Sequence, residues 1–209
     1  MWLPRLSQGS VSFPQADNFQ DGTTQNWTDG AGNNASNIGT GGPAGAGDRY
    51  LQVVSGAFGG GPRLVVFNES QWVGNFSSKG ITGISMSLQN FSGGTLPIRI
   101  AIREAFGGSG TPGYASSVPF NLAADGQWHT AFFSFSAGSL TGINSPQPLA
   151  TDLANVADFR ILSSASPSLI GDSISAKIGV DNITALPEPG ALALIGLGIA
   201  GIWLKRRKA

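Results

Sequence analysis

The sequence predicts an all-β fold, a jelly-roll-type antiparallel β-sandwich followed by a single C-terminal transmembrane helix. Short runs of β-forming residues recur along the chain, and turn residues separate them. Helical periodicity is nearly absent before residue 186, whereas the last two dozen residues contain one long apolar run. These features predict a strand-rich body and a separate tail.

About eight runs have the length and composition of strands, and turn residues lie between them. They cover residues 49–55, 62–68, 81–90, 96–104, 116–122, 128–135, 156–164 and 174–185. An Asp-Gly pair at 125–126 predicts a turn directly before the run that starts at Trp128. This number of short strands is typical of a two-sheet sandwich.

The run at residues 96–104 shows the clearest alternation. Isoleucine occupies positions 98, 100 and 102, and Arg99 and Arg103 project to the opposite side. A period of two predicts a strand with one buried face. The two arginines therefore lie either on a solvated strand face or along a ligand groove.

The chain divides into three segments: residues 1–15, 16–185 and 186–209. The first is irregular and lacks the apolar run of a secretory signal peptide, so we expect an export signal encoded upstream of Met1. The second is the β-sandwich ectodomain. The third begins with Leu-Pro-Glu-Pro, where two prolines remove backbone donors and stop strand pairing.

The C-terminal segment has the features of a membrane anchor. Residues 191–204 carry no charged side chain and would form a helix about 21 Å long, short for a bilayer core. Trp203 suits the headgroup level, and four cations follow it: Lys205, Arg206, Arg207 and Lys208. These cations predict a cytoplasmic tail and an external body. The alternative is a core helix of the folded domain.

Pro187-Glu188-Pro189, the apolar run and the basic cluster together resemble the PEP-CTERM sorting signal, also called the ice-binding protein C-terminal motif. The resemblance implies an exosortase substrate in the envelope of a Gram-negative bacterium. It also implies a link to exopolysaccharide or biofilm matrix. The segment is also similar to an LPxTG sortase signal, but Pro189 replaces the threonine, which disfavours that reading.

Four stretches of the body resemble jelly-roll carbohydrate-binding-module-like domains: residues 18–30, 48–53, 125–135 and 178–186. The resemblance implies a two-sheet sandwich, frequently with a structural calcium near the chain ends. Candidate ligands are the four aspartates Asp17, Asp21, Asp48 and Asp181. The alternative is that these residues cap turns and strand ends. Calcium is the only cofactor expected, and none is required.

Sugar binding by such folds uses aromatic faces beside polar groups. The aromatic candidates are Trp27, Trp72, Tyr114 and Trp128. Trp72 lies between predicted strands and is the one expected to be exposed. Trp128 opens an alternating strand and is expected in the core. Trp72, Arg99 and Arg103 are the predicted ligand-binding residues.

Composition argues against several functions. Residues 1–185 hold eight basic and eleven acidic side chains, a net charge of −3, so no basic surface for nucleic acid is expected. Cysteine is absent and His129 is the single histidine, which leaves no triad and no multi-histidine metal site. Glu69 and Glu104 lie in separate segments. We therefore expect no enzyme.

The sequence thus predicts an exported envelope or matrix protein with a structural or adhesive role linked to extracellular polysaccharide. Its C-terminal helix spans the membrane once, the N-terminal domain lies outside, and an exosortase then releases the body to the cell surface. One alternative is a carbohydrate-binding module with a specific glycan ligand. A second is a glycan hydrolase, which would need two carboxyl groups on either side of the scissile bond.

Overall fold

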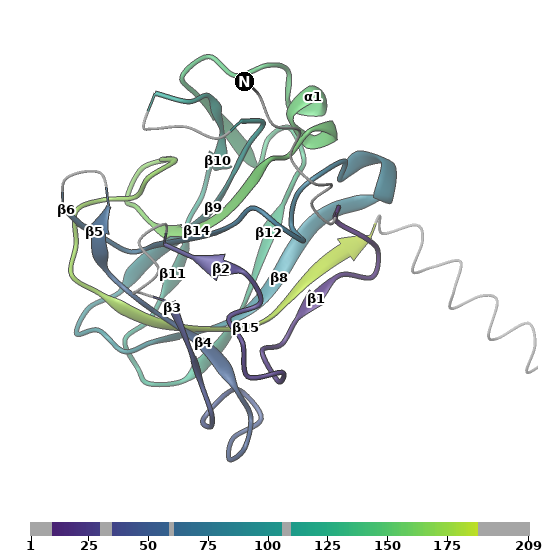
Figure 1. The fold of residues 1–209 in the computed structure, drawn as a ribbon. Coiled ribbons are helices and arrows are strands. Elements are labelled where there is room, and N and C mark those ends of the chain that lie inside the picture. The colour runs from purple at the N-terminus through teal and green to yellow at the C-terminus, as the bar shows by residue number, and fades with distance from the viewer. Residues whose placement is uncertain (1–9, 30–34, 59–60, 106–109, 188–209) are drawn as a thin grey trace, which may run out of the picture.

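The computed structural model describes residues 10–29, 35–58, 61–105 and 110–187, and these form an all-β sandwich (Figure 1). Two antiparallel sheets pack face to face, which confirms the all-β sandwich part of the predicted fold class. The described residues contain one short α-helix, α1 (Leu149–Ala154), and one 3-10 turn, Ser77–Lys79. Among them, no helix is long and apolar enough to cross a membrane.

The first sheet has six strands, in the order β12-β8-β15-β4-β3, with β1 paired to β15. Its strands are β1 (Ala16–Asp17), β3 (Ala35–Ile38), β4 (Tyr50–Val54), β8 (Ile81–Asn90), β12 (Trp128–Ser134) and β15 (Lys177–Pro187). The last strand of the chain, β15, therefore lies between β8 and β4 in the middle of this sheet.

The second sheet has seven strands, in the order β13-β10-β9-β14-β7-β2, with β11 paired to β9. Its strands are β2 (Trp27–Thr28), β7 (Val65–Asn68), β9 (Leu96–Arg103), β10 (Gly113–Ser116), β11 (Phe120–Leu122), β13 (Leu140–Ile143) and β14 (Asp158–Ser163). A separate hairpin joins β5 (Gly56–Phe58) to β6 (Gly61–Arg63).

The hydrophobic core lies between the two sheets and follows from strand alternation. On β9, Ile98, Ile100 and Ile102 are fully buried in it, as the period of two predicts. On the facing sheet, β8 contributes Ile84 and Leu88 to the same cluster. Each sheet therefore has an inner face in this core and an outer face directed away from it.

The strand predictions agree with the structure in the long elements. Strand β8 has the predicted bounds, and β4, β9, β12 and β14 lie within or nearly within predicted runs. The turn before β12 is also confirmed, since Gly126 has a φ of +72° and the Gln127 amide donates to Asp125 Oδ1. Two predicted runs are interrupted: 62–68 gives β6 and β7, and 116–122 gives the end of β10 and β11.

Candidate functional site

Asp17, a predicted calcium ligand, is the acceptor in a buried hydrogen-bond network. Its Oδ2 accepts hydrogen bonds from Trp72 Nε1 at 2.6 Å, Trp27 Nε1 at 2.7 Å and Gln71 Nε2 at 2.9 Å. Burial raises the pKa of Asp17, and the hydrogen bonds from Trp72, Trp27 and Gln71 oppose that rise. The carboxylate thus joins three segments that are distant in sequence.

The prediction that Trp72 is an exposed sugar platform is wrong. Its side chain is fully buried in the core, because the indole N–H has Asp17 as a partner and the ring packs against Phe159 with centroids 5.6 Å apart. Trp27 is buried in the same way, 5.8 Å from Phe159. A buried indole needs such a partner for its N–H group.

Arg99 and Arg103 project opposite the isoleucines as predicted, but neither lines an open groove. They are 2% and 1% exposed. The guanidinium of Arg99 donates to three carbonyl oxygens: Ser116 at 2.5 Å, Ala165 at 2.8 Å and Ser164 at 2.9 Å. Burial lowers the pKa of Arg99.

The physical reason for this burial is a segment that crosses the outer face of the seven-stranded sheet. Residues 164–172 bring Leu169 into a second apolar cluster with Ala101 and Leu162, whose side chains lie on that face. Arg160 Nη1 donates to the Leu169 carbonyl at 2.9 Å. Both faces of this sheet are therefore covered, a feature that alternation within single strands does not reveal.

Arg103 belongs to a buried ion-pair network on the same face. Asp158 Oδ2 contacts Arg103 Nη2 at 2.5 Å and Arg160 Nη2 at 2.7 Å, and the three side chains are at most 3% exposed. Burial lowers the pKa of Arg103, and the charge of Asp158 opposes this effect. The network connects β9 to β14 and is buried from solvent.

The four predicted calcium ligands do not form one cluster. Among the residues that the structure describes, no three His, Cys, Asp or Glu side chains come together as a metal site. Asp17 is used by the indoles, and the exposed Asp21 carboxylate accepts from the backbone and hydroxyl of Thr23. The pKa of Asp21 is lowered, mainly by the Thr23 amide.

Of the four, Asp48 and Asp181 are linked by charge, since the carboxylate of Asp48 acts on the pKa of Asp181. Asp181 is fully buried, and its Oδ1 has no hydrogen-bond partner. Burial raises the pKa of Asp181 to about 7, and the negative charge of Asp48 adds to this rise. An unpartnered buried carboxylate oxygen is rare in folded proteins and fits the oxygen-rich coordination that calcium prefers.

Three oxygen atoms, one of them from Asp48, converge on the side-chain amide of Gln20. The Gln20 amide nitrogen Nε2 lies 2.8 Å from Asp48 Oδ1, 3.0 Å from the Asn18 carbonyl and 3.2 Å from the Arg49 carbonyl. An amide nitrogen has two hydrogens, so it cannot satisfy all three acceptors fully. Gln20 was not among the candidates from sequence, because an amide side chain carries no charge signal.

The outer face of the six-stranded sheet carries the best candidate for ligand binding. On β12, Ala131 and Phe133 face the core, so Trp128, Thr130 and Phe132 project outward. Phe132 is 67% exposed. On the neighbouring strand β8, the outward positions opposite these three residues are Gln89, Ser87 and Ser85. The face therefore combines exposed aromatic rings with hydroxyl and amide groups.

Trp128 forms an aromatic cluster with Tyr50 and Phe91 at one end of this outer face. The Tyr50 ring lies 5.3 Å from the Trp128 ring and 6.1 Å from the Phe91 ring, and Trp128 Nε1 donates to the Gly41 carbonyl at 3.0 Å. A Cβ on Gly179 would lie 2.7 Å from the indole, so only glycine fits beneath it. Trp128 is half-buried on this outer face, and its predicted place in the core is wrong.

Of the sorting motif, Pro187 is described and forms the last residue of β15. The other predicted sorting residues, Glu188 and Pro189, lie outside the described residues. So do the predicted membrane helix at 191–204 and the basic cluster at 205–208. Tyr114, a further aromatic candidate, is partly buried against the core, and its hydroxyl donates to the Gln147 carbonyl at 2.8 Å.

Comparison with known proteins identifies the C-terminal segment. Residues 185–208 match the family model of the PEP-CTERM protein-sorting motif. This match implies an exported, envelope-targeted protein. No curated protein sequence matches the chain.

Several solved structures are similar to this chain in fold. An exo-β-agarase matches with a TM-score of 0.52 and 10% identity over 83% of this chain, which spans 24% of the agarase chain. The family 11 carbohydrate-binding module from Clostridium thermocellum, solved with a β-1,3-1,4-mixed-linked tetrasaccharide, matches with a TM-score of 0.48 and 17% identity. That match covers 78% of this chain and 89% of the module.

The K1 cleaved adhesin domain of Lys-gingipain from Porphyromonas gingivalis W83 has a TM-score of 0.47 and 11% identity, over 85% of this chain and 99% of that domain. Identities this low show the fold alone. The chain is therefore an all-β sandwich that carries a PEP-CTERM protein-sorting motif at residues 185–208.

Proposed function

We propose that the chain is an envelope protein of a Gram-negative bacterium whose sandwich binds extracellular polysaccharide and whose C-terminal segment is processed by an exosortase. The sorting role is supported by the match at residues 185–208. The binding role is supported by one observation above all, the outer face of the six-stranded sheet, where Phe132 and Trp128 lie on a strand with hydroxyl and amide groups beside them.

The chemistry of this face suits a neutral sugar chain. Aromatic rings stack on the apolar faces of sugar rings, and hydroxyl and amide side chains bond to sugar hydroxyls. Trp128 and Phe132 are four residues apart on β12, about 13 Å along a strand. A ligand that contacts both must therefore be an extended chain of several sugar units.

Substitution of the exposed ring tests this proposal. Phe132→Ala removes a ring that is 67% exposed, so the fold should remain intact while retardation by soluble polysaccharides in affinity gel electrophoresis is lost or strongly reduced. Trp128→Ala should have the same effect on retardation. A panel of soluble β-glucans and galactans supplies the probes.

The control is Asn121→Ala, an exposed position on β11 of the opposite sheet. This variant should migrate like the unsubstituted protein in every gel. If the Phe132 and Trp128 variants were retarded as strongly as the unsubstituted protein and the Asn121 variant, the outer face of the six-stranded sheet would be excluded as the binding surface.

The proposed route to the envelope uses the tail. The apolar residues 191–204 span the membrane once, with the basic cluster 205–208 on the cytoplasmic side and the sandwich outside. Processing then releases the sandwich to the cell surface or matrix, where polysaccharide binding gives an adhesive or structural role. No catalytic step is assigned to the sandwich.

We also infer a structural calcium held by Asp48 and Asp181. The unpartnered Asp181 Oδ1 and the oxygen atoms that converge on Gln20 support it. These residues join the N-terminal segment, the loop before β4 and the last strand, so a cation here would stabilise the closure of the sandwich. Asp17 and Asp21 are not part of this proposed ligand set.

A further inference from the structure

The sorting segment begins inside the folded domain. The matched residues start at 185, whereas β15 continues to Pro187. Ala185 pairs with Ile84 of β8, is 3% exposed, and its amide donates to the Gln15 carbonyl at 3.0 Å. The first three residues of the sorting segment are therefore part of a central strand.

Thr82 holds the last residue of that strand. Proline has no N–H, so the carbonyl is the one backbone group of Pro187 that can form a hydrogen bond. It accepts from Thr82 Oγ1 at 3.0 Å. Pro187 also stands opposite Ile81, beyond a register irregularity at Leu186. One side-chain hydroxyl thus adds to the strand pairing at this end of the sheet.

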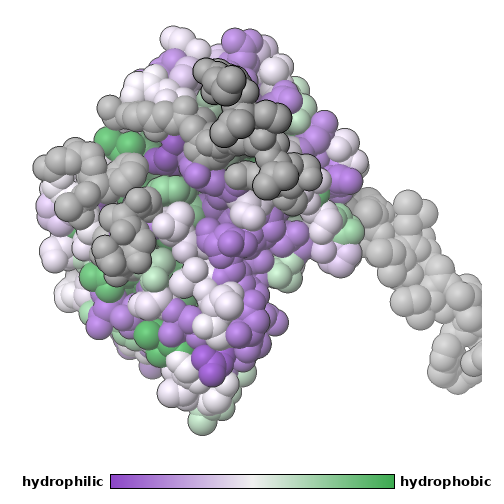
Figure 2. Space-filling view, in the orientation of Figure 1, coloured by the Kyte–Doolittle hydropathy of each residue, from purple (hydrophilic) through white to green (hydrophobic). Residues whose placement is uncertain are grey.

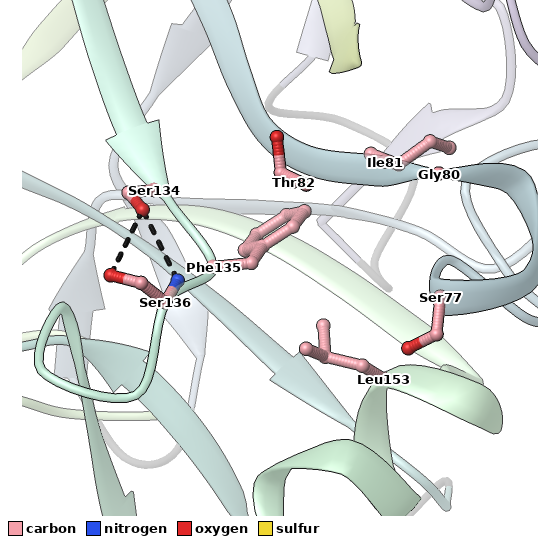
Figure 3. Close-up of a pocket in the computed structure, with 8 residues that line it drawn as sticks. All are labelled: Ser77, Gly80, Ile81, Thr82, Ser134, Phe135, Ser136 and Leu153. Carbon is pink, nitrogen blue, oxygen red and sulfur yellow. Dashed lines mark hydrogen bonds between the residues drawn. The ribbon is translucent and has the colours of Figure 1, made fainter. Parts of the chain in front are cut away.

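Thr82 also borders a hollow at the same end of the sandwich. Figure 3 shows Thr82, Ile81, Phe135 and Leu153 around this space, whose volume is about 420 Å³. The side chain that binds Pro187 is therefore near solvent rather than deep in the core, and Thr82 is half-buried. Replacing its hydroxyl should leave the sandwich folded.

We propose that Thr82 is a positioning residue for processing, because it holds the Pro187 end of the sorting segment in the sheet. This end must separate from β8 before the processing enzyme can bind the segment. The proposal rests on the sorting role proposed above. A processing enzyme that takes its substrate as an extended strand needs backbone groups that β8 and Thr82 occupy here. The rate of processing then follows the small population in which the strand end is open.

The test measures conversion of the full-length chain to its processed form by pulse-chase, in cells that contain an exosortase and with an export signal ahead of the chain. Thr82→Val removes the hydroxyl at nearly constant size and should raise the rate about fivefold, the effect of one net hydrogen bond. Thr82→Ser retains the hydroxyl and should restore the native rate. A Gly-Ser segment inserted between Leu186 and Pro187 should also raise the rate.

Thr141→Val is the matched control, since Thr141 is an exposed threonine on β13 of the other sheet and its hydroxyl hydrogen-bonds to the Ser117 hydroxyl at 2.9 Å. It should process at the native rate, and all variants should remain folded, with melting temperatures within a few degrees of the native value. A native rate for Thr82→Val would overturn the role of Thr82, and a native rate for the Gly-Ser insertion would show that the strand end need not leave β8.

A further pair of variants separates this proposal from the sorting role. Glu188→Ala and Pro189→Ala alter motif residues that follow Pro187 in the sequence and should block processing. If they block it while Thr82→Val stays at the native rate, the sorting role stands and the positioning role is wrong. If they are processed normally, the sorting role itself is wrong.

Discussion

Two buried aspartates show how surroundings decide what a carboxylate does. Asp17 has hydrogen-bond donors for its charge, and it ties together the indoles of Trp27 and Trp72. Asp181 has one unpartnered oxygen, and its pKa rises from 3.8 to about 7. The first is a structural acceptor, whereas the second carries an energetic penalty that a proton or a cation can remove.

The raised pKa of Asp181 predicts a specific dependence of stability on pH. Between about pH 4 and pH 7 the folded state binds a proton that the unfolded state has lost, so stability falls as pH rises through this window and then levels off. Asp152 contributes in the same direction up to about pH 6, because burial raises its pKa to about 6. Urea unfolding at a series of pH values measures this fall.

Asp181→Asn should remove the decrease in the free energy of unfolding that lies nearest pH 7.

Added calcium should raise the melting temperature of the native chain above pH 7. The calcium effect should be absent in Asp181→Asn and Asp48→Asn and present in Asp125→Asn, whose carboxylate is exposed. A melting temperature that is the same in calcium and in a chelator would show that Asp48 and Asp181 hold no calcium.

At the scale of elements, the sequence predicts the long strands well and their outer faces poorly. The isoleucines of β9 place the core correctly, because one face of that strand is apolar and the other carries arginines. In β12 both faces carry aromatic rings, so the alternation does not decide which face is buried, and the prediction for Trp128 is wrong. The same pattern cannot show that residues 164–172 cover Arg99 and Arg103, since that contact joins segments more than sixty residues apart.

The short elements were missed for a related reason. Strands of two residues such as β1 and β2, and the six-residue helix α1, have no room for a periodic signal. The aromatic cluster around Trp128 also depends on the order of strands in the sheet, which brings Tyr50 of β4 near the start of β12. The sorting signal is predicted from sequence because its three parts, residues 187–189, 191–204 and 205–208, follow one another along the chain.

The buried ion pairs of Asp158 with Arg103 and Arg160 lead to a prediction about stability. Asp158→Ala leaves Arg103 and Arg160 buried without their carboxylate, so the free energy of unfolding should fall by about 3–5 kcal/mol. Asp125→Ala, which breaks the exposed pair with His129, should cost far less, because solvent screens that pair. Urea unfolding measures both, and equal small losses would show that the buried network does not stabilise the fold.

For the whole molecule, the two proposed roles belong to different parts of one sheet. Strand β15 lies in the middle of the six-stranded sheet and leads into the sorting segment, while the exposed ring of Phe132 lies on β12, two strands away. The side of the molecule in Figure 2 shows mainly hydrophilic and neutral residues with separate hydrophobic ones, as expected for a domain that faces water. Anchoring and polysaccharide binding can therefore operate together.

The central claim is that the C-terminal segment, and not the sandwich, directs the protein to the envelope. Cell fractionation of the full chain and of a chain that ends at Pro187, both behind the same export signal, tests it most directly. The account predicts that the full chain is found first in the membrane and then at the cell surface, whereas the shortened chain is released without a membrane-bound stage. An identical distribution of the two chains would contradict it.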